Sequence, residues 1–436
     1  MSHILLIPFG TSGSIFPFIW LGRQLLERGH RVTMIASSIY QQTAESEGIG
    51  FVAPDTDVLP LMLAEADLWQ PGEFKRVAFT YAGRATGPCV AAIERVLQEI
   101  GKADLMLAPM ISFGARIARE KYRLPLITVH LYPAAMMSAD DVPLVLPGFR
   151  LLRLLPLAWR KFILSLPSPY DPFAIPAVAE ACAVHGVTPP TRLWKLWHHS
   201  PDGVLALFPS WFSRVEKDQP DNTLQWDFPL EDMVQQRGMA AELEQFLAAG
   251  ERPVVFTAGT GQYHATKFFA IASRVVGELG CRAVFLTSKS EQVPLHLPSS
   301  IFVSAYAPFS LLLPRAAVMV HHGGIGTVAQ CFAAAIPQLV VHMSLDQPDN
   351  AARIERLGVG LSIGIGRLTA GRLLPLLQRC LEDASIRENA LERARLLQQR
   401  PSAAALCAWL EAAIAGEAVP QTQDPRLEDP RAENLT

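Results

Sequence analysis

Residues 317–344 read AVMVHHGGIGTVAQCFAAAIPQLVVHMS. The stretch starts with a short apolar run, turns through three glycines, continues with an alanine-rich segment and ends in a second apolar run. This order predicts a strand, a tight turn, a helix and a second strand parallel to the first. Runs that are apolar throughout are typical of parallel strands covered on both faces. The stretch therefore predicts a doubly wound α/β fold.

The same alternation occurs in both halves of the chain. HILLIPFG (3–10), FPFIWLGRQLLERGH (16–30) and RVTMIAS (31–37) repeat it near the start, and PVVFTAGTG (253–261) and KFFAIASRVVGELG (267–280) repeat it later. A pattern that restarts indicates two separate sheets. We therefore expect two Rossmann-like, doubly wound parallel-sheet domains.

The length of 436 residues also favours two cores over one. The polar, proline-marked segment 216–238 is interpreted as the connection between them. We place one domain at 1–225 and the other at 226–400. Residues 416–436 are charged and rich in proline, and we expect a disordered tail there.

Composition excludes several classes of function. A net charge of −3 gives no reason to expect a nucleic-acid partner. No run of about 18 uncharged apolar residues could span a membrane, and the N-terminus lacks the features of a signal peptide. The six cysteines form no C-x-x-C pair, and only Cys182 has a histidine close by, His185. A reduced, metal-free, cytoplasmic protein is the simplest interpretation.

Residues 142–168 depart from the pattern. The segment combines leucine, tryptophan and phenylalanine with four cationic residues and contains no acidic one. One interpretation is a pair of helices packed on the N-terminal core. The other is a basic, apolar surface, which either rests on the inner face of an anionic membrane or borders an apolar pocket for the acceptor.

The glycine turn itself has the features of an anion site. Glycines let the backbone approach a ligand closely, and free N–H groups at the start of the helix point at it. A histidine can donate a hydrogen bond to a phosphate oxygen, and Thr327 can cap the helix or contact the ligand. The glycine turn TAGTGQ (257–262) should lie at the same edge of the sheet. The alternative is a purely structural turn.

Two nucleotide motifs were compared with this turn. The spacing does not match G-x-x-x-x-G-K-[ST], which excludes a P-loop. GIGTVA fits the loose dinucleotide form, with Asp346 about 20 positions on, but it follows a later strand than that fingerprint requires. Asp346 next to Gln347 is instead a good pair for vicinal sugar hydroxyls.

Together, AYAPFSLLLP (305–314), HHGGIGTVAQ (321–330) and LDQPDNAARIERLGVG (345–360) resemble the donor-sugar signature of the family 1, UDP-glycosyltransferase-like GT-B glycosyltransferases. FPFIWLG and HSPDGVLALFPSWF (199–212) look most similar to bacterial rhamnosyltransferases of the rhamnolipid type. The resemblance implies a GT-B fold whose two domains face a cleft. It implies an acceptor-binding N-terminal domain, a donor-binding C-terminal domain and a last helix, at 401–415, that packs back on the first domain.

The resemblance also implies roles for single residues. Tyr306 would stack on the donor base, and Ala307 would offer backbone groups to the edge of the base. His322 would bind the diphosphate if the spacing is counted back from Pro337, whereas His321 would do so if the H-x-G pattern is matched. The remaining donor contacts would come from both loops and from the strand that follows: Thr260, Gly324, Gly326 and Thr327 at the phosphates, Gln330 at the ribose, and Asp346 and Gln347 at the sugar.

The implied reaction is a displacement with inversion at the anomeric carbon, without a metal or cofactor. The donor would be dTDP-rhamnose or a UDP-hexose, and the acceptor a small apolar or acidic molecule, such as a hydroxy fatty acid derivative or a secondary metabolite. The D-x-D at Asp55 to Asp57 mimics a metal motif but lies far in sequence from the phosphate loops.

The family places its catalytic base in the first glycine-rich loop, where this chain has Ser14. A serine cannot act as a base at neutral pH; Ser14 could instead orient an acceptor or cap the helix. Three explanations stay open: an acceptor that is already acidic, another base such as His130, or a non-catalytic subunit that binds sugar nucleotides. A GT-B nucleotide-sugar epimerase is a further alternative.

Overall fold

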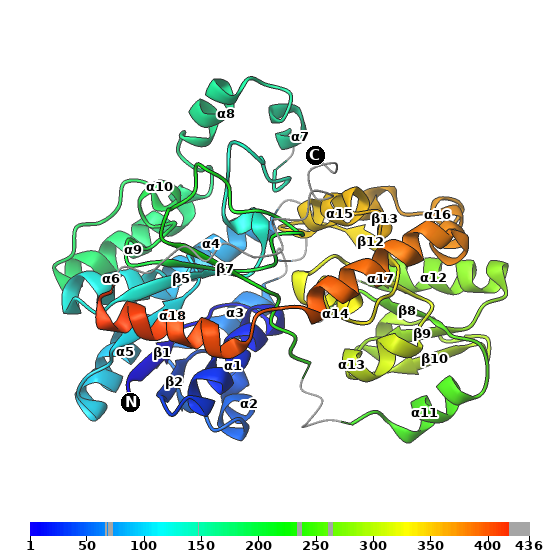
Figure 1. Ribbon diagram of the computed structural model, residues 1–436, viewed down its shortest axis with the longest axis horizontal. Coiled ribbons are helices and arrows are strands. Elements are labelled where there is room, and N and C mark those ends of the chain that lie inside the picture. Colours follow the sequence, from blue (N-terminus) through cyan, green and yellow to red (C-terminus); the bar gives the residue numbers. More distant parts are fainter. Residues whose placement is uncertain (66–67, 69–72, 147, 233–237, 260–264, 418–436) are drawn as a thin grey trace. The chain divides into compact units, whose positions relative to one another are not determined.

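The computed structural model describes residues 1–65, 68, 73–146, 148–232, 238–259 and 265–417. The chain divides into two compact units (Figure 1). Unit 1 contains Met1–Asp227 and the described residues from Pro401 onward, and unit 2 contains Phe228–Arg400. The division falls two residues beyond the expected position.

Each unit is built on one parallel sheet, which confirms the predicted pair of doubly wound sheets. Within the described residues the unit 1 sheet has the order β3 (Gly50–Val52), β2 (Arg31–Ile35), β1 (His3–Leu6), β4 (Leu105–Ala108), β5 (Leu126–His130), β6 (Val204–Leu207) and β7 (Thr223–Trp226). The unit 2 sheet has the order β10 (Ile301–Ser304), β9 (Ala283–Leu286), β8 (Val254–Thr257), β11 (Val318–His321), β12 (Gln338–His342) and β13 (Gly360–Gly364).

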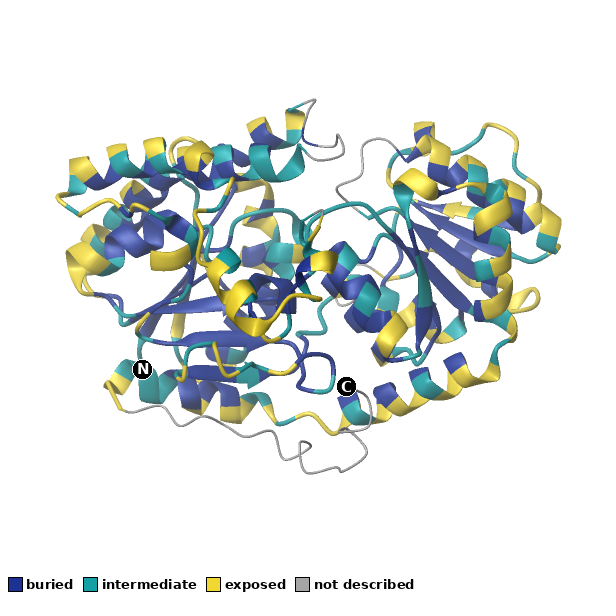
Figure 2. Cartoon of the chain, turned by 90° about the horizontal axis from the view of Figure 1, so that it is seen from above, coloured by how far each residue is buried: buried dark blue, intermediate teal, exposed yellow. Residues whose placement is uncertain are grey.

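Helices cover both faces of each sheet, so successive strand residues enter different cores (Figure 2). In β1, Leu5 packs with side chains of α5 (Thr86–Ile100), whereas Leu6 faces Gly22 of α1 (Ser12–Glu27). In β8, Phe256 packs with α12 (Thr266–Leu279), and Val255 lies in the opposite core with α11 (Ala241–Ala248). This double cover is the physical reason for the uninterrupted apolar runs.

The remaining helices are distributed over the two units. In unit 1 they are α2 (Gln41–Ser46), α3 (Leu59–Ala64), α4 (Phe74–Arg84), α6 (Phe113–Tyr122), α7 (Phe149–Leu152), α8 (Leu157–Leu164), α9 (Asp171–His185), α10 (Leu193–Leu196) and α18 (Ala403–Ala415). In unit 2 they are α13 (Phe309–Leu312), α14 (Ile325–Ala333), α15 (Gln347–Arg356), α16 (Ala370–Glu382) and α17 (Ala384–Gln398).

The last helix, α18, packs on α1 in unit 1. Glu411 of α18 accepts hydrogen bonds from Arg28 (3.1 and 2.8 Å) and contacts a ring nitrogen of His30 at 3.0 Å. These contacts assign the end of the described chain to the N-terminal unit, although the chain first passes through unit 2. The predicted tail lies outside the described residues from position 418 on.

Two expectations are corrected by the structure. The segment 216–238 is not only a connection, because it contains β7, the edge strand of the unit 1 sheet. Prolines and acidic residues on either side of TLQW masked this short strand. Ser14 does not cap α1, because that helix begins at Ser12 and its N-cap is Thr11. Pro17 is tolerated inside the helix near its start, where it removes only the bond to Gly13.

Candidate functional site

The strand order places ligand-binding positions in both units. Where two neighbouring strands are followed by helices that cross to opposite sides of the sheet, a crevice forms at the carboxyl ends of those strands. Open α/β sheets bind ligands in this crevice. The reversal falls between β1 and β4 in unit 1 and between β8 and β11 in unit 2. The two glycine turns of unit 2 follow β8 and β11, so both lie at this position.

The two adjacent histidines after β11 have different environments. His321 is completely buried, its Nε2 lies 3.1 Å from Oε1 of Gln338, and its Nδ1 accepts a hydrogen bond from the backbone of Gly323. His321 therefore supports the turn from inside and cannot reach a ligand. His322 is only partly buried. Of the two alignments, the geometry favours His322 as the phosphate contact.

The His322 ring lies between the two glycine turns. A Cβ on Gly259, in the turn after β8, would lie 2.6 Å from the ring, and a Cβ on Gly324 would lie 2.5 Å from its Nε2. Gly259 also has a φ of +87°, which disfavours any residue with a side chain. The loops after β8 and β11 thus meet at His322. Thr260, predicted to contact the phosphates, lies outside the described residues.

Replacement of Gly324 tests the position of the ring. We expect Gly324→Ala to push the His322 imidazole aside and to weaken binding of a nucleoside diphosphate by about tenfold, as loss of one charge-assisted hydrogen bond would. Calorimetric titration with dTDP and UDP measures the change. Gly277→Ala is the matched control, because a Cβ there meets nothing within 4 Å. Equal affinities of the two variants would contradict the assignment.

The start of α14 supplies the backbone part of the site. Gly324 is the N-cap of the helix, and no side chain caps it. Its first N–H groups are therefore free to bind an anion at the positive end of the helix dipole. Gly326 is exposed and Thr327 partly buried in this first turn. Gln330, predicted at the ribose, is 7% exposed, which leaves little of its amide available.

The pair predicted to bind the sugar lies at the start of α15. Asp346 and Gln347 are 9% and 8% exposed. Gln347 uses Oε1 to accept hydrogen bonds from the backbone of Met343 (2.8 Å) and Ser344 (3.2 Å). Leu345, directly before the pair, has a φ of +60°, a strained conformation for a leucine. Backbone strain of this kind concentrates at functional sites.

Sequence reasoning missed Asn350, which connects the pair to the glycine turn. Its Nδ2 donates to the carbonyl of Gly323 at 2.9 Å and to Oδ2 of Asp346 at 2.7 Å, and the residue is completely buried. One amide therefore fixes the glycine turn and the Asp346 carboxylate relative to each other. Its position four residues after Asp346, on one face of a helix, was the available signal.

Tyr306 and Ala307 follow β10 at the same edge of the sheet. Tyr306 is partly buried, and its hydroxyl donates to the carbonyl of Asp232 at 2.6 Å. Ala307 is 5% exposed and packs in the core with Val255 and Met319. The ring of Tyr306 is thus tied to the start of unit 2 by its hydroxyl.

Burial changes the expected charge of the phosphate loop. It lowers the pKa of His321 to about 3 and that of His322 to about 4. Both imidazoles are therefore neutral at pH 7 before a ligand binds, and His322 would act as a hydrogen-bond donor rather than as a cation.

These low pKa values predict acid sensitivity. Because the unfolded chain binds protons near pH 6.5 and the folded chain does not, stability is complete above pH 6.5 and falls as the pH drops towards 4. We expect His321→Gln to reduce this slope by about 1.4 kcal/mol per pH unit. Urea unfolding in EDTA between pH 7 and 5 measures it, and an unchanged slope would show that His321 is already protonated in the folded protein.

In unit 1, a pocket lies at the crevice between β1 and β4. Its walls are mainly apolar, with Ile7, Phe9, Ile35, Val58 and Phe113 among them. Ser14 is partly buried nearby, with its Oγ 3.0 Å from the place where a Cβ on Gly10 would lie, and Gly10 lines the pocket.

Asp57 adds a carboxylate to this pocket, which sequence reasoning considered only as a metal-motif mimic. Oδ2 of Asp57 accepts hydrogen bonds of 2.8 Å from the Ser37 hydroxyl and from the backbone and hydroxyl of Ser38. Oδ1 accepts one bond of 3.3 Å, from the backbone of Leu59. Asp55 instead forms an ion pair with Arg95. The two carboxylates of the D-x-D therefore have separate roles.

His130, the other proposed base, is 1% exposed, and burial among other cationic or ionisable groups lowers its pKa well below the usual range. A base must reach its substrate, so this burial argues against the role. His130 lies instead in a cluster with His198 and His199. Those two are adjacent in the chain, whereas His130 is far from both in sequence. Cys182 is completely buried, and His185 lies near Lys121 and Glu94.

The chain was compared with known proteins. Residues 272–413 match the family model of the erythromycin biosynthesis protein CIII-like C-terminal domain. An O-mycaminosyltylonolide 6-deoxyallosyltransferase of Streptomyces fradiae is 27% identical over 91% of this chain and 92% of its own length. The glycosyltransferase GtfC of Amycolatopsis orientalis is 25% identical over 83% and 86%.

The chain is a glycosyltransferase with the GT-B fold. Solved structures show the same fold: the glycosyltransferase VinC, in complex with dTDP, has a TM-score of 0.70 at 19% identity and covers 95% of this chain and 100% of its own. The spinosyn rhamnosyltransferase SpnG has a TM-score of 0.68 at 18% identity and covers 94% and 100%. The matched family model is named after an erythromycin biosynthesis protein, and an aclacinomycin-T 2-deoxy-L-fucose transferase of Streptomyces galilaeus is 32% identical over 29% of this chain.

Proposed function

We propose that the glycosyltransferase moves a hexose, with rhamnose as the first candidate, from a dTDP-sugar to a small apolar acceptor. The observation that carries this proposal is Asn350, which joins the sugar-binding Asp346 to the glycine turn that His322 faces. Such an arrangement binds a sugar and a diphosphate at a fixed separation. The complexes of VinC with dTDP and of SpnG with thymidine diphosphate support thymidine over uridine as the donor nucleoside.

In the reaction, an acceptor oxygen forms a bond to the anomeric carbon as the bond from that carbon to the diphosphate breaks. The electron pair of the broken bond stays on the diphosphate. The first N–H groups of α14 and the imidazole of His322 stabilise the charge that develops there. Asp346 and Gln347 hold the sugar hydroxyls, so the anomeric carbon is oriented for attack.

The unit 1 pocket supports an apolar acceptor with one polar group. Because Ser14 cannot take a proton, the acceptor proton needs another destination. Asp57 is a carboxylate in the pocket lining, and its Oδ1 accepts a long bond of 3.3 Å, so Oδ1 can take the proton that the acceptor hydroxyl loses as it attacks the anomeric carbon. A carboxylate in this place favours a neutral hydroxyl acceptor over one that is already ionised.

A donor and acceptor screen tests the function. The purified protein is incubated with dTDP-rhamnose, dTDP-glucose, UDP-glucose and UDP-N-acetylglucosamine, with hydroxy fatty acids, aglycones and phenolic acids as acceptors. Mass spectrometry detects the products. We expect transfer from a dTDP-sugar to a hydroxyl group. Transfer only from UDP-sugars would overturn the donor assignment, and interconversion of donor sugars would indicate an epimerase.

A second proposal concerns the segment 142–168, of which residue 147 lies outside the described residues. All eight residues of α8 are described, and none is buried. Leu151, Leu154, Trp159, Phe162 and Leu166 expose between 50% and 79% of their surface, and Figure 1 shows α8 standing clear of the unit 1 sheet. Packing on the core is therefore not the role of α8. We propose that this surface contacts an anionic membrane. No described helix is long and apolar enough to cross one.

Vesicle sedimentation tests this contact. We expect the protein to sediment with vesicles that contain phosphatidylglycerol and much less with pure phosphatidylcholine. Trp159→Ser with Phe162→Ser should weaken binding by at least about tenfold, since two aromatic side chains lose their burial. Leu295→Ser is the control, because Leu295 is 97% exposed but lies in unit 2. Unchanged sedimentation of the double variant would contradict the proposal.

A further inference from the structure

Three histidines of unit 1 meet in the core although no sequence motif joins them. His130 ends β5, and His198 and His199 lie in the loop before β6. Each ring offers one nitrogen that could bind a metal ion, and these ligand atoms lie within 4.8 Å of one another. The ring centroids are 5.3 Å apart for His130 and His198, 5.0 Å for His130 and His199, and 4.2 Å for His198 and His199.

The hydrogen bonds within this cluster are incomplete. Nε2 of His130 lies 3.0 Å from Nδ1 of His199, so these two rings share one hydrogen bond. His198 is 4% exposed, and the backbone carbonyls of Ala135 and Met136 lie near its ring. Among the described residues, neither ring nitrogen makes a hydrogen bond of normal distance and angle. A buried polar group in this state is destabilising, so a ligand on the His198 ring would be favourable.

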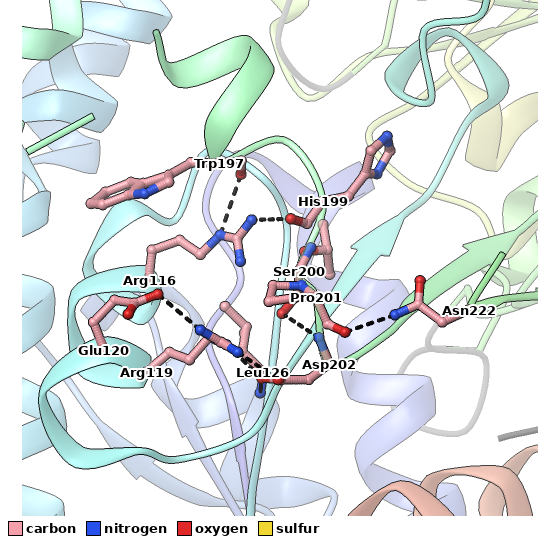
Figure 3. A network of polar contacts seen from close by, with 11 residues as sticks. Arg116, Arg119, Glu120, Leu126, Trp197, His199, Ser200, Pro201, Asp202 and Asn222 are labelled. Atoms are coloured by element: carbon pink, nitrogen blue, oxygen red, sulfur yellow. Dashed lines mark hydrogen bonds and ion pairs between the residues drawn. The ribbon is translucent and has the colours of Figure 1, made fainter. Parts of the chain in front are cut away.

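The loop that carries two of the rings is held rigidly by its backbone. Arg116 donates to the carbonyls of Trp197 and His199, and Asn222 donates to the carbonyl of Pro201 at 2.9 Å. Asp202 binds Arg119 through both oxygens at 2.6 Å and accepts from the backbone of Leu126 in β5. Figure 3 shows this network, with the His199 ring directed away from the Arg116 guanidinium.

We propose that His130, His198 and His199 form a binding site for a transition-metal ion of the Zn²⁺ class. Three imidazoles and one open position are the donor set of many zinc sites. With Zn–N distances of about 2.0–2.1 Å, tetrahedral ligand nitrogens lie about 3.4 Å apart. Metal binding would replace the hydrogen bond between His130 and His199, and its proton would move to the other nitrogen of the ring that donates it. These two nitrogens would separate slightly, and the wider pairs would close by small ring movements. The loop backbone need not move.

The charge of the surroundings bears on the fourth ligand. Imidazole binds metal in its neutral form. The rings bring no negative charge, and Arg116 adds a positive one nearby. We therefore expect an anionic fourth ligand, such as hydroxide or chloride.

The test uses the full chain without a polyhistidine tag, freed of metal by EDTA. Elemental analysis after dialysis against Zn²⁺ should give one equivalent per chain. Co²⁺ should give the intense visible absorption of a tetrahedral site. His198→Phe keeps the ring that packs on Trp194 but removes both nitrogens, and His130→Gln keeps a polar partner for His199. Each variant should bind Zn²⁺ at least tenfold more weakly.

His296→Ala is the control, because His296 is an exposed histidine of unit 2 and its variant should bind like the wild type. Zn²⁺ should raise the Tm of the wild type and of this control but not that of His198→Phe. The proposal is overturned if the wild type binds less than a tenth of an equivalent at about 0.1 mM Zn²⁺, or if the cluster variants bind as tightly as the wild type. The Zn²⁺ content of the wild type tests the proposal even if a variant does not fold.

Discussion

Asp346→Ala is expected to lower kcat/KM for sugar transfer by about 10²- to 10⁴-fold. The carboxylate would lose two charge-assisted hydrogen bonds to the sugar, each worth about 1.5–3 kcal/mol. Asn350 would lose one of its two acceptors, so the glycine turn would also lose its connection to the sugar site. Release of the nucleoside diphosphate in the presence of an acceptor measures the rate.

Two further variants separate chemistry from folding. Asp346→Asn keeps an oxygen that can accept from Asn350 but removes the charge, and it should lose most of the activity while the Tm stays near that of the wild type. Ser14→Ala should retain most of the transfer activity, because a serine cannot act as a base. If Ser14→Ala were inactive and Asp346→Ala active, the assignments of both residues would be wrong.

Arg353→Met is expected to destabilise unit 2 by about 3–5 kcal/mol. Arg353 and Asp349 form an ion pair of 2.8 Å within α15, and their side chains are 4% and 0% exposed. Removal of the cation takes the Arg353 charge away from a buried carboxylate, and this costs far more than the pair contributes. The midpoint of denaturant unfolding, followed in the wild type and the variant, measures the loss.

The double variant Asp349→Leu with Arg353→Met should recover most of this stability, because it removes both charges and retains apolar volume. Because α15 carries Gln347 and Asn350, we also expect the single variant to bind donor more weakly, even at temperatures where it stays folded. A loss of less than about 1 kcal/mol in Arg353→Met would show that Asp349 finds other partners.

The fold was predictable because the signals are local. In the sequence, strands buried on both faces are uninterrupted apolar runs, such as those around Leu5 and Phe256, and the turns that follow them contain glycines. The short edge strand β7 was missed, since four residues between polar segments carry too weak a pattern. The start of α1 was placed too late, because Gly13 and Pro17 suppress the helical signal although both fit the first turns.

The donor motifs could likewise be recognised in the sequence, because each lies within a few residues of one strand end. The sequence did not show which residue of each motif faces a ligand. Sequence alone could not decide between His321 and His322; the structure separates them because successive strand-end residues point in different directions, one into the core towards Gln338 and one into the space between Gly259 and Gly324.

By itself, then, the sequence determined the two parallel sheets and the glycine turns at their carboxyl ends, and it predicted the residues of a sugar-nucleotide site. Only the tertiary structure decided that Asn350 joins Asp346 to the glycine turn, that Asp57 lines the unit 1 pocket, and that His130 meets His198 and His199. The physical reason is the distance along the chain over which each interaction acts. Backbone patterns arise between neighbours in the chain, whereas these side chains come together only after the sheets have folded and brought distant segments to one edge or one core.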